Sequence, residues 1–297
     1  MIGLPLLLGL VSLAAALITG ALGYGYSSIT VPIALLAISS KRLNPALVIV
    51  ETMVNGYAAI MYRRSIRAIW PHVAPVVIGV IPGVVAGALL LASLPVGTIK
   101  LVCYSALLPL ILIQAAGLRI AIRHTRAVGV PFGVAVGVLY SMTTISGPPL
   151  ALFFNNQGLA KEDFKVALAL TRTIESVLTL AAYAWLGLLT WDAAELTGYL
   201  VPGVLIGMPL GHALIRRFAP EIFRRVCMSF DAWLVGFGLS RLVDDAIALP
   251  PGVSYVVLAV TIVVDAMLLR SFFRQRAAAS SNPSRTRPAV STSIQRR

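Results

Sequence analysis

The feature that most constrains this chain is a succession of apolar segments with almost no charge inside them. A helix of about 20 apolar residues spans a hydrocarbon core about 30 Å thick, so such segments predict membrane-spanning helices. Of the 297 residues, 58% are hydrophobic and 12% are charged, against roughly 45–50% and 25% in soluble domains. These values exclude a soluble globular protein and indicate one all-α polytopic membrane unit. The candidate segments are 4–22, 28–39, 44–62, 70–92, 97–117, 127–145, 147–157, 164–187, 196–214, 221–240 and 252–272.

Two of these segments, 28–39 and 147–157, are too short to span a bilayer comfortably. Each follows a stretch rich in Gly, Ser or Thr, at Gly23–Ser28 and at Ser141–Gly147. Short or interrupted apolar segments at corresponding places in two halves of a chain point to a transporter binding site. We therefore expect broken or re-entrant helices at these two places, and whether they span or re-enter the membrane stays open.

The position of the charges gives an orientation. The net charge is +13, and the basic residues cluster in loops. If each segment counts as one crossing, the positive-inside rule places the N-terminus outside and the C-terminus in the cytoplasm of a cell (inner) membrane protein. The other side carries little beyond Lys41, Arg42 and the mixed loop Arg241–Asp245. The predicted cytoplasmic side carries Arg63, Arg64, Arg67, Arg119, Arg123, Arg126, Lys161, Lys165, Arg216, Arg217, Arg224, Arg225 and a basic tail.

The two halves of the chain repeat one order of features. Gly20–Pro32 aligns with Gly137–Pro149, and a Trp followed by Pro-Gly-x-x-x-Gly occurs in each half, with Pro82 to Gly87 in the first. Each half has five elements, an odd number, so the second half begins on the opposite side and the repeat is inverted, as in many secondary carriers. The predicted units are a first repeat at 1–120, a second repeat at 121–245, an extra helix at 246–273 and a disordered basic cytoplasmic tail at 274–297. The glycines of the Pro-Gly helices are expected to pack helices together.

This order of motifs resembles the sulfite exporter TauE/SafE family of membrane permeases, over roughly residues 8–245. The motifs are the Gly-rich turn before a Pro-containing short helix, Trp70, the Pro82–Gly87 motif and a second copy with Ser146-Gly-Pro-Pro149. The resemblance implies transport of sulfite, thiosulfate, sulfoacetate or related organosulfonates. Family members usually carry three consecutive glycines in the first turn, where this chain has Gly23-Tyr-Gly-Tyr-Ser-Ser. The identity of the substrate is therefore not carried over.

The two polar turns are the first candidate site. An anion that crosses a membrane needs donors in place of water, and the N-terminus of a half-helix offers free N–H groups with a partial positive charge. Ser and Thr hydroxyls add further donors. The alternative is that these hydroxyls only cap broken helices. The candidate substrate-binding residues here are Gly23, Gly25, Ser27, Ser28, Thr30, Thr143, Thr144, Ser146 and Gly147, and Tyr24, Tyr26 and Tyr140 flank them.

Charged residues inside apolar segments are the second candidate. Glu51 and Asn55 lie four positions apart in one segment, and Arg172 and Glu175 lie three apart in the matching one. Because charge within a membrane is costly, such residues pair, line a wet cavity or act in transport. Arg172, which the sequence repeat aligns with Asn55, either binds the anion while Glu51 or Glu175 carries a proton, or forms a structural ion pair. Two other buried acids are weaker candidates: Asp231, near Arg224 and Arg225, and Asp265, which aligns with nothing.

Other classes of function fit less well. Three His and two Cys have no metal-ligand spacing, so we expect no catalytic residues, metal or cofactor. No Walker loop is present, which argues against an ATP-driven motor. The expected partners are a small anionic substrate and the lipid bilayer, without nucleic acid, and a homo-oligomer is left open. The sequence thus predicts an anion permease, with proton coupling as an option and with an anion channel or a membrane-embedded structural subunit as alternatives.

The orientation can be tested with reporter fusions. Green fluorescent protein fused after Arg297 is expected to fluoresce and alkaline phosphatase at the same place to be inactive, because the tail is predicted to be cytoplasmic. Fusions within the loop at 188–195 serve as the control and should show the opposite pattern. An active phosphatase after Arg297 would contradict the orientation.

Overall fold

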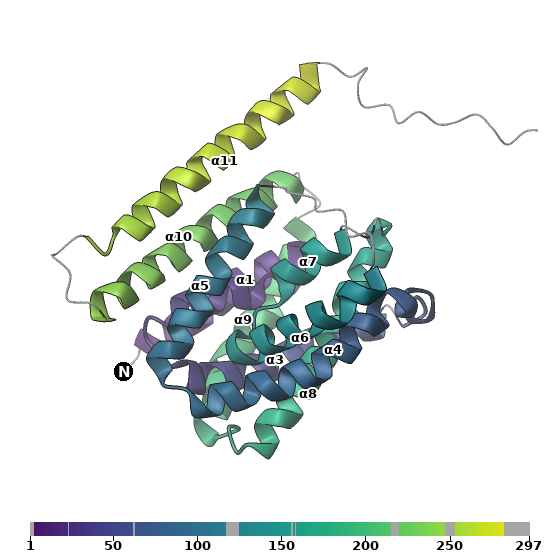
Figure 1. Cartoon of the computed structure of the whole chain (residues 1–297), viewed down its shortest axis with the longest axis vertical. Coiled ribbons are helices and arrows are strands. Elements are labelled where there is room, and N and C mark those ends of the chain that lie inside the picture. Colours follow the sequence, from purple (N-terminus) through teal and green to yellow (C-terminus); the bar gives the residue numbers. More distant parts are fainter. Residues whose placement is uncertain are drawn as a thin grey trace, which may run out of the picture.

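The computed structural model describes residues 3–22, 24–61, 63–116, 125–155, 157, 159–214, 220–246 and 253–281. In these residues all the regular structure is helical, so the predicted all-α class is confirmed. Figure 1 shows the helices as one packed group with a long final helix along its side. The helices are α1 (Gly3–Leu22), α2 (Tyr26–Ala34), α3 (Ser40–Met61), α4 (Ile66–Ser93), α5 (Val96–Ala115), α6 (Thr125–Thr143), α7 (Gly147–Asn155), α8 (Lys161–Trp185), α9 (Trp191–Leu214), α10 (Pro220–Ala246) and α11 (Val256–Ser281).

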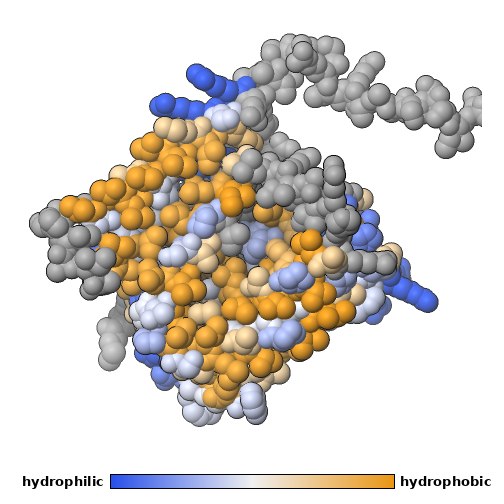
Figure 2. Space-filling view, viewed as in Figure 1, coloured by the Kyte–Doolittle hydropathy of each residue, from blue (hydrophilic) through white to orange (hydrophobic). Residues whose placement is uncertain are grey.

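Seven of the described helices are long and apolar enough to cross a membrane: α1, α3, α4, α5, α8, α9 and α11. The spans of α3 and α8 are 56% buried inside the protein, whereas that of α11 is only 11% buried. The pair α3 and α8 therefore forms the centre of the bundle, and α11 lies at its edge. Figure 2 shows apolar residues over most of the visible face, with the most hydrophilic residues at its margins. In a bilayer this apolar face is the surface that meets lipid.

The two short segments form the short helices α2 and α7, of nine residues each. At 1.5 Å per residue each rises about 14 Å, less than half of the hydrocarbon core. The residue before α2 is Gly25, whose φ of 111° lies in the left-handed region that glycine adopts without strain. Helix α7 begins Gly147-Pro148-Pro149, and proline suits a first helical turn because the missing N–H would be unpaired there in any case.

The tightest packing joins one half of the chain to the other, because α4 lies against α6 and α1 lies against α9. A Cβ on Gly83 of α4 would collide with the backbone of Val134, and one on Gly203 of α9 with the backbone of Leu13. The packing role expected for these glycines is thus confirmed. If each helix is replaced by its counterpart in the other half, the contact of α4 with α6 becomes the contact of α9 with α1. The inverted relation of the halves and the domain boundaries stay predictions.

The last helix lies outside both halves. α11 contacts α10 and α5 (Figure 1), and it continues to Ser281, eight residues into the predicted disordered tail. The cause is the helix-forming run Arg274-Gln-Arg-Ala-Ala-Ala, since Arg, Gln and Ala have high helix propensity. The rest of the predicted tail lies outside the described residues.

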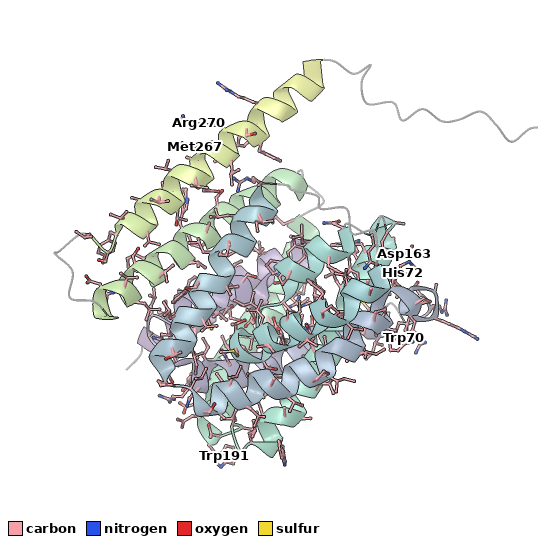
Figure 3. All side chains as sticks on the ribbon, in the orientation of Figure 1. Trp70, His72, Asp163, Trp191, Met267 and Arg270 are labelled. Carbon is pink, nitrogen blue, oxygen red and sulfur yellow. The ribbon has the colours of Figure 1, made fainter. Side chains whose placement is uncertain are left out.

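Aromatic residues mark the margins of the bundle. Figure 3 places Trp70, His72 and Asp163 together at one edge and Trp191 at another. Trp70 is 45% exposed and Trp191 90% exposed. Tryptophan is enriched where a membrane meets water, and this fits the position of both residues at the ends of long helices.

Two glycines of α9 offer a matched test of the helix packing. Gly203→Ala is expected to lower the free energy of unfolding by about 1–3 kcal/mol, because its Cβ would overpack against Leu13 and Ser12. Gly198→Ala lies on the same helix with nothing within 4 Å, so it should be neutral or stabilising by up to about 1 kcal/mol. Thermal unfolding in detergent measures both, and equal effects would contradict the packing argument.

Candidate functional site

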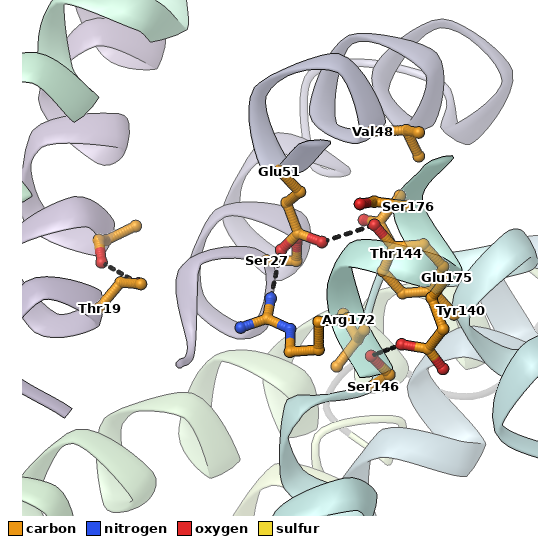
Figure 4. A network of polar contacts seen from close by, with 12 residues as sticks. Thr19, Ser27, Val48, Glu51, Tyr140, Thr144, Ser146, Arg172, Glu175 and Ser176 are labelled. Atoms are coloured by element: carbon orange, nitrogen blue, oxygen red, sulfur yellow. Dashed lines mark hydrogen bonds and ion pairs between the residues drawn. The ribbon is translucent and has the colours of Figure 1, made fainter. Parts of the chain in front are cut away.

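A buried carboxylate at the centre of the bundle accepts hydrogen bonds from three other helices. Glu51 of α3 accepts from Ser27 of α2 at 2.7 Å and from Arg172 of α8 at 2.8 Å, both through Oε1. Its Oε2 accepts from the hydroxyl of Tyr140 of α6 at 2.8 Å. Figure 4 shows these side chains converging on the carboxylate. Because Glu51 is 1% and Arg172 3% exposed, the pair is an ion pair shielded from solvent.

A second carboxylate lies close by. Glu175, one turn after Arg172 on α8, accepts a hydrogen bond from Ser146 at 2.6 Å through Oε2. Ser146 directly precedes α7, and Ser27 is the second residue of α2. Each short helix therefore begins beside a carboxylate. The positive end of a helix dipole favours such an anion, so the two half-helix starts form an electrostatic environment suited to negative charge.

Side chains of α3 and α8 hydrogen-bond to the backbone near the turn between α6 and α7. Asn44 donates to the carbonyl of Met142 at 2.5 Å, and Tyr183 donates to the carbonyl of Ser141. Thr144 has a φ of 58°, a conformation that is strained for a β-branched residue. These contacts fix Ser146 in its place beside Glu175.

The two polar turns meet. A Cβ on Gly147 would lie 3.2 Å from the ring of Tyr24, so the ring of the first turn rests on the backbone of the second. The candidate residues Ser27, Ser28, Thr30, Thr143, Thr144, Ser146 and Gly147 are all buried. The structure therefore brings the two predicted half-sites into one region. Gly25 is partly exposed, and Gly23 lies outside the described residues.

The hydroxyl groups of the two turns have different kinds of hydrogen-bond acceptor. Ser27 and Ser146 donate to the two carboxylates. Thr143 donates to the carbonyl of Leu139, and Thr144 donates to the carbonyl of Thr143. The two threonines thus hydrogen-bond to the local backbone, as expected if the hydroxyls cap broken helices. The two serines instead hydrogen-bond to the carboxylates.

Several buried polar atoms near the ion pair have no hydrogen-bond partner among the described residues. They are Nε and Nη1 of Arg172, Oε1 of Glu175, Nδ2 of Asn55 and Oγ1 of Thr30. A buried donor that is left unsatisfied costs about 1–3 kcal/mol, and more when it is charged. Such atoms are rare in native structures, and two of those named here belong to the guanidinium of Arg172.

The helix starts correct the register of the sequence repeat. Glu51 and Arg172 each lie eleven residues after the first residue of their helices, Ser40 and Lys161. In this register Arg172 is opposite Glu51, not Asn55 as the motif alignment predicted. The packing contacts support the same register. Leu13 of α1 contacts α9, and Val134 of α6 contacts α4. The sequence separation between Leu13 and Val134 equals that between Ser40 and Lys161. The sequence motif gave a shift of four residues because Gly and Pro recur at several positions in each turn.

A second buried ion pair was missed by the sequence alignment. Asp265 of α11 lies 2.9 Å from Arg225 of α10, and the two are 0% and 3% exposed. Arg225 also donates to Ser229 at 3.2 Å. The only sequence signal for this pair is the presence of two lone charges in apolar segments. The side chain of Asp231, the predicted neighbour of Arg225, lies outside the described residues.

Comparison with known proteins identifies relatives of the chain. Residues 8–239 match the family model described as "Sulfite exporter TauE/SafE". The chain is 30% identical over 203 residues to the probable sulfite/organosulfonate exporter TauE of Cupriavidus necator, and the match covers 66% of this chain and 77% of that protein. No solved structure matches the chain.

The energetic role of the ion pair can be measured by removing its partners in turn. Arg172→Gln and Glu51→Gln are each expected to lower the free energy of unfolding by roughly 3–5 kcal/mol, because each leaves a buried charge unpaired. The double variant should lose clearly less than the sum of the single losses. Chemical unfolding in detergent gives the values.

An exposed ion pair supplies the control. Glu162→Gln removes the pair of Glu162 with Lys165, whose side chains are 71% and 40% exposed, and the expected loss is about 0–1 kcal/mol. Additive losses in the buried pair would show that Glu51 and Arg172 do not interact.

Proposed function

Because the chain belongs to the sulfite exporter TauE/SafE family, we propose that it is a secondary transporter that binds a small sulfur-containing oxyanion at Arg172. The family consists of exporters, so membership confirms a membrane transporter in place of an enzyme. The relative in C. necator is described as exporting sulfite or organosulfonate, and we propose the same class of substrate here. The proposed orientation has the N-terminus outside and the C-terminus in the cytoplasm.

The single observation that supports this site is the guanidinium of Arg172. Its Nη2 donates to Glu51, while Nε and Nη1 are buried without a hydrogen-bond partner among the described residues. A guanidinium is permanently charged and carries five N–H donors. Sulfite and sulfonate groups carry three oxygens and can accept from Nε or Nη1 while they also accept from a serine.

The carboxylate of Glu51 accepts hydrogen bonds from the same donors that could bind a substrate oxyanion. Arg172, Ser27 and Tyr140 all donate to it, and together they supply one positive charge and two hydroxyl groups. A substrate anion at Arg172 therefore competes electrostatically with the carboxylate of Glu51. The two anions are compatible only when part of the negative charge is removed, and protonation of a carboxylate does this.

The charge balance of the site favours joint binding of the anion and a proton. With both carboxylates ionised, Glu51 and Glu175 outweigh the single charge of Arg172, and a bound anion adds to the excess. Protonation of Glu175, whose Oε1 has no partner among the described residues, offsets that excess without breaking the ion pair. We propose that Glu175 is the proton-carrying residue and that the two unwound turns close around the anion by alternating access of the two repeats.

The proposal is tested by transport in liposomes. The wild type is expected to show saturable flux of methanesulfonate, an anion that stays ionised over the working pH range, and the flux should fall as pH rises. The variant with Glu51→Gln and Arg172→Gln together keeps a neutral buried pair and should fold, yet its flux should be lower by roughly 100-fold or more, because the charged donor is lost.

Glu175→Gln separates the proton from the anion. This variant is expected to keep methanesulfonate binding and to lose most of the pH dependence of flux. Glu162→Gln, on the exposed first turn of the same helix, is the matched control and should behave as the wild type. Ohmic, unsaturable conductance would instead identify a channel, and full activity of the double variant would exclude Arg172 as the anion site.

A further inference from the structure

A pocket lies at the C-terminal end of the short helix α2. It has a volume of about 270 Å³ and opens between the end of α2, the first turns of α5 and the last turns of α10. Two cationic residues, Lys100 and Arg241, line it together with the aromatic residues Tyr104 and Phe237. The pocket is thus positively charged on one part of its wall and apolar on another.

The pocket is built by contacts that converge on the C-terminal end of α2. Lys100 donates to the carbonyl of Leu35 at 2.6 Å, and Tyr104 donates to the carbonyl of Pro32 at 3.1 Å. A Cβ on Gly238 of α10 would lie 2.7 Å from a ring carbon of Tyr104, so the glycine lets this ring lie against α10. An ammonium group has three donors, and the contact with Leu35 uses one of them.

Lys100 and Arg241 differ from the other basic residues on the predicted outer side of the membrane. The predicted outer side is poor in positive charge, and two other basic residues there have evident partners. Lys41 donates to the carbonyl of Ala92 at 2.9 Å, and Arg42 pairs with Asp192 at 3.1 Å. Arg241, by contrast, is exposed and lines the pocket beside Lys100.

We propose that this pocket is a second oxyanion site, at the mouth of the transport pathway, which takes the sulfonate or phosphate group of an amphiphilic anion. The proposal rests on the proposed function, because it places a transported anion at both ends of α2. Ser27, near the start of α2, contacts the central carboxylate, and Leu35, just after its end, lies at the pocket. Ser27 and Leu35 are eight positions apart, so the helix separates the two sites by about 12 Å. The apolar part of the wall favours an organosulfonate over inorganic sulfite.

Direct binding distinguishes the two sites. The full chain is placed in phosphatidylcholine nanodiscs, and binding of trifluoromethanesulfonate is followed by fluorine NMR, which detects weak binding. The wild type is expected to show two sites. Arg241→Gln, and separately Lys100→Gln, should weaken only the mouth site by roughly tenfold, because a focused positive potential is lost. The variant with Glu51→Gln and Arg172→Gln should lose only the central site.

The controls separate this proposal from the proposed function. Arg42→Gln removes a cation on the same side outside the pocket and should leave both sites unchanged. Lys100→Arg keeps the charge and should retain the mouth site. If Arg241→Gln and Lys100→Gln both bind as the wild type, the mouth site is refuted while the central site stands. If only the central double variant is without effect, the central site is refuted instead.

Nanodiscs of different lipid composition distinguish a lipid phosphate from a soluble anion as the occupant of the mouth site. Phosphatidylglycerol added to the nanodiscs should displace the sulfonate from the mouth site if a lipid phosphate is its occupant. This displacement should then be absent in Arg241→Gln. Without displacement, the occupant is the soluble anion. Both results retain an oxyanion site, whereas displacement that is equal in wild type and Arg241→Gln would overturn it.

Discussion

The ion pair of Glu51 with Arg172 is the interaction on which the centre of this bundle depends. Two opposite charges in an apolar interior are tolerated only with close geometry and with hydrogen bonds to the remaining lone pairs. Ser27 and Tyr140 supply those bonds to Glu51. Together the four residues come from α2, α3, α6 and α8, so the need to satisfy one carboxylate fixes the relative positions of four helices. Through Ser27 this requirement ties the start of the short helix α2 to the centre of the bundle.

The pair also shows why the two halves differ in sequence. Glu51 and Arg172 occupy equivalent places, each eleven residues into the third helix of its half. Two identical halves would bring two carboxylates or two guanidinium groups together at this contact, and like charges at such a distance repel strongly in an apolar medium. A single chain with two diverged halves can place opposite charges there. The centre is therefore asymmetric in charge although the packing of α4 on α6 repeats that of α1 on α9.

Much of this arrangement could be predicted from the sequence, because its cause is local. Apolar length predicts the helices, and the Gly, Ser and Thr around Tyr24 and Ser146 predict the two breaks. The presence of Glu51 and Arg172 in apolar segments predicts that they are either paired or functional. The identity of their neighbours could not be predicted, because Tyr140 reaches Glu51 only through the packing of α6, and Asp265 reaches Arg225 only through the docking of α11. The four-residue error in register has the same origin, since recurrent glycines carry little positional information until backbones are in contact.

The left-handed conformation of Thr144 has a consequence for the balance between conformations. A residue held in such a region raises the free energy of its state by about 1–3 kcal/mol. The contacts of Asn44 and Tyr183 with the neighbouring carbonyls hold the turn in this form. Any second state of the protein in which this turn relaxes gains back that free energy, and a gain of about 1.4 kcal/mol changes the ratio of two populations tenfold. A threonine at this position therefore shifts the balance towards such a relaxed state, compared with a glycine, which adopts a positive φ without strain.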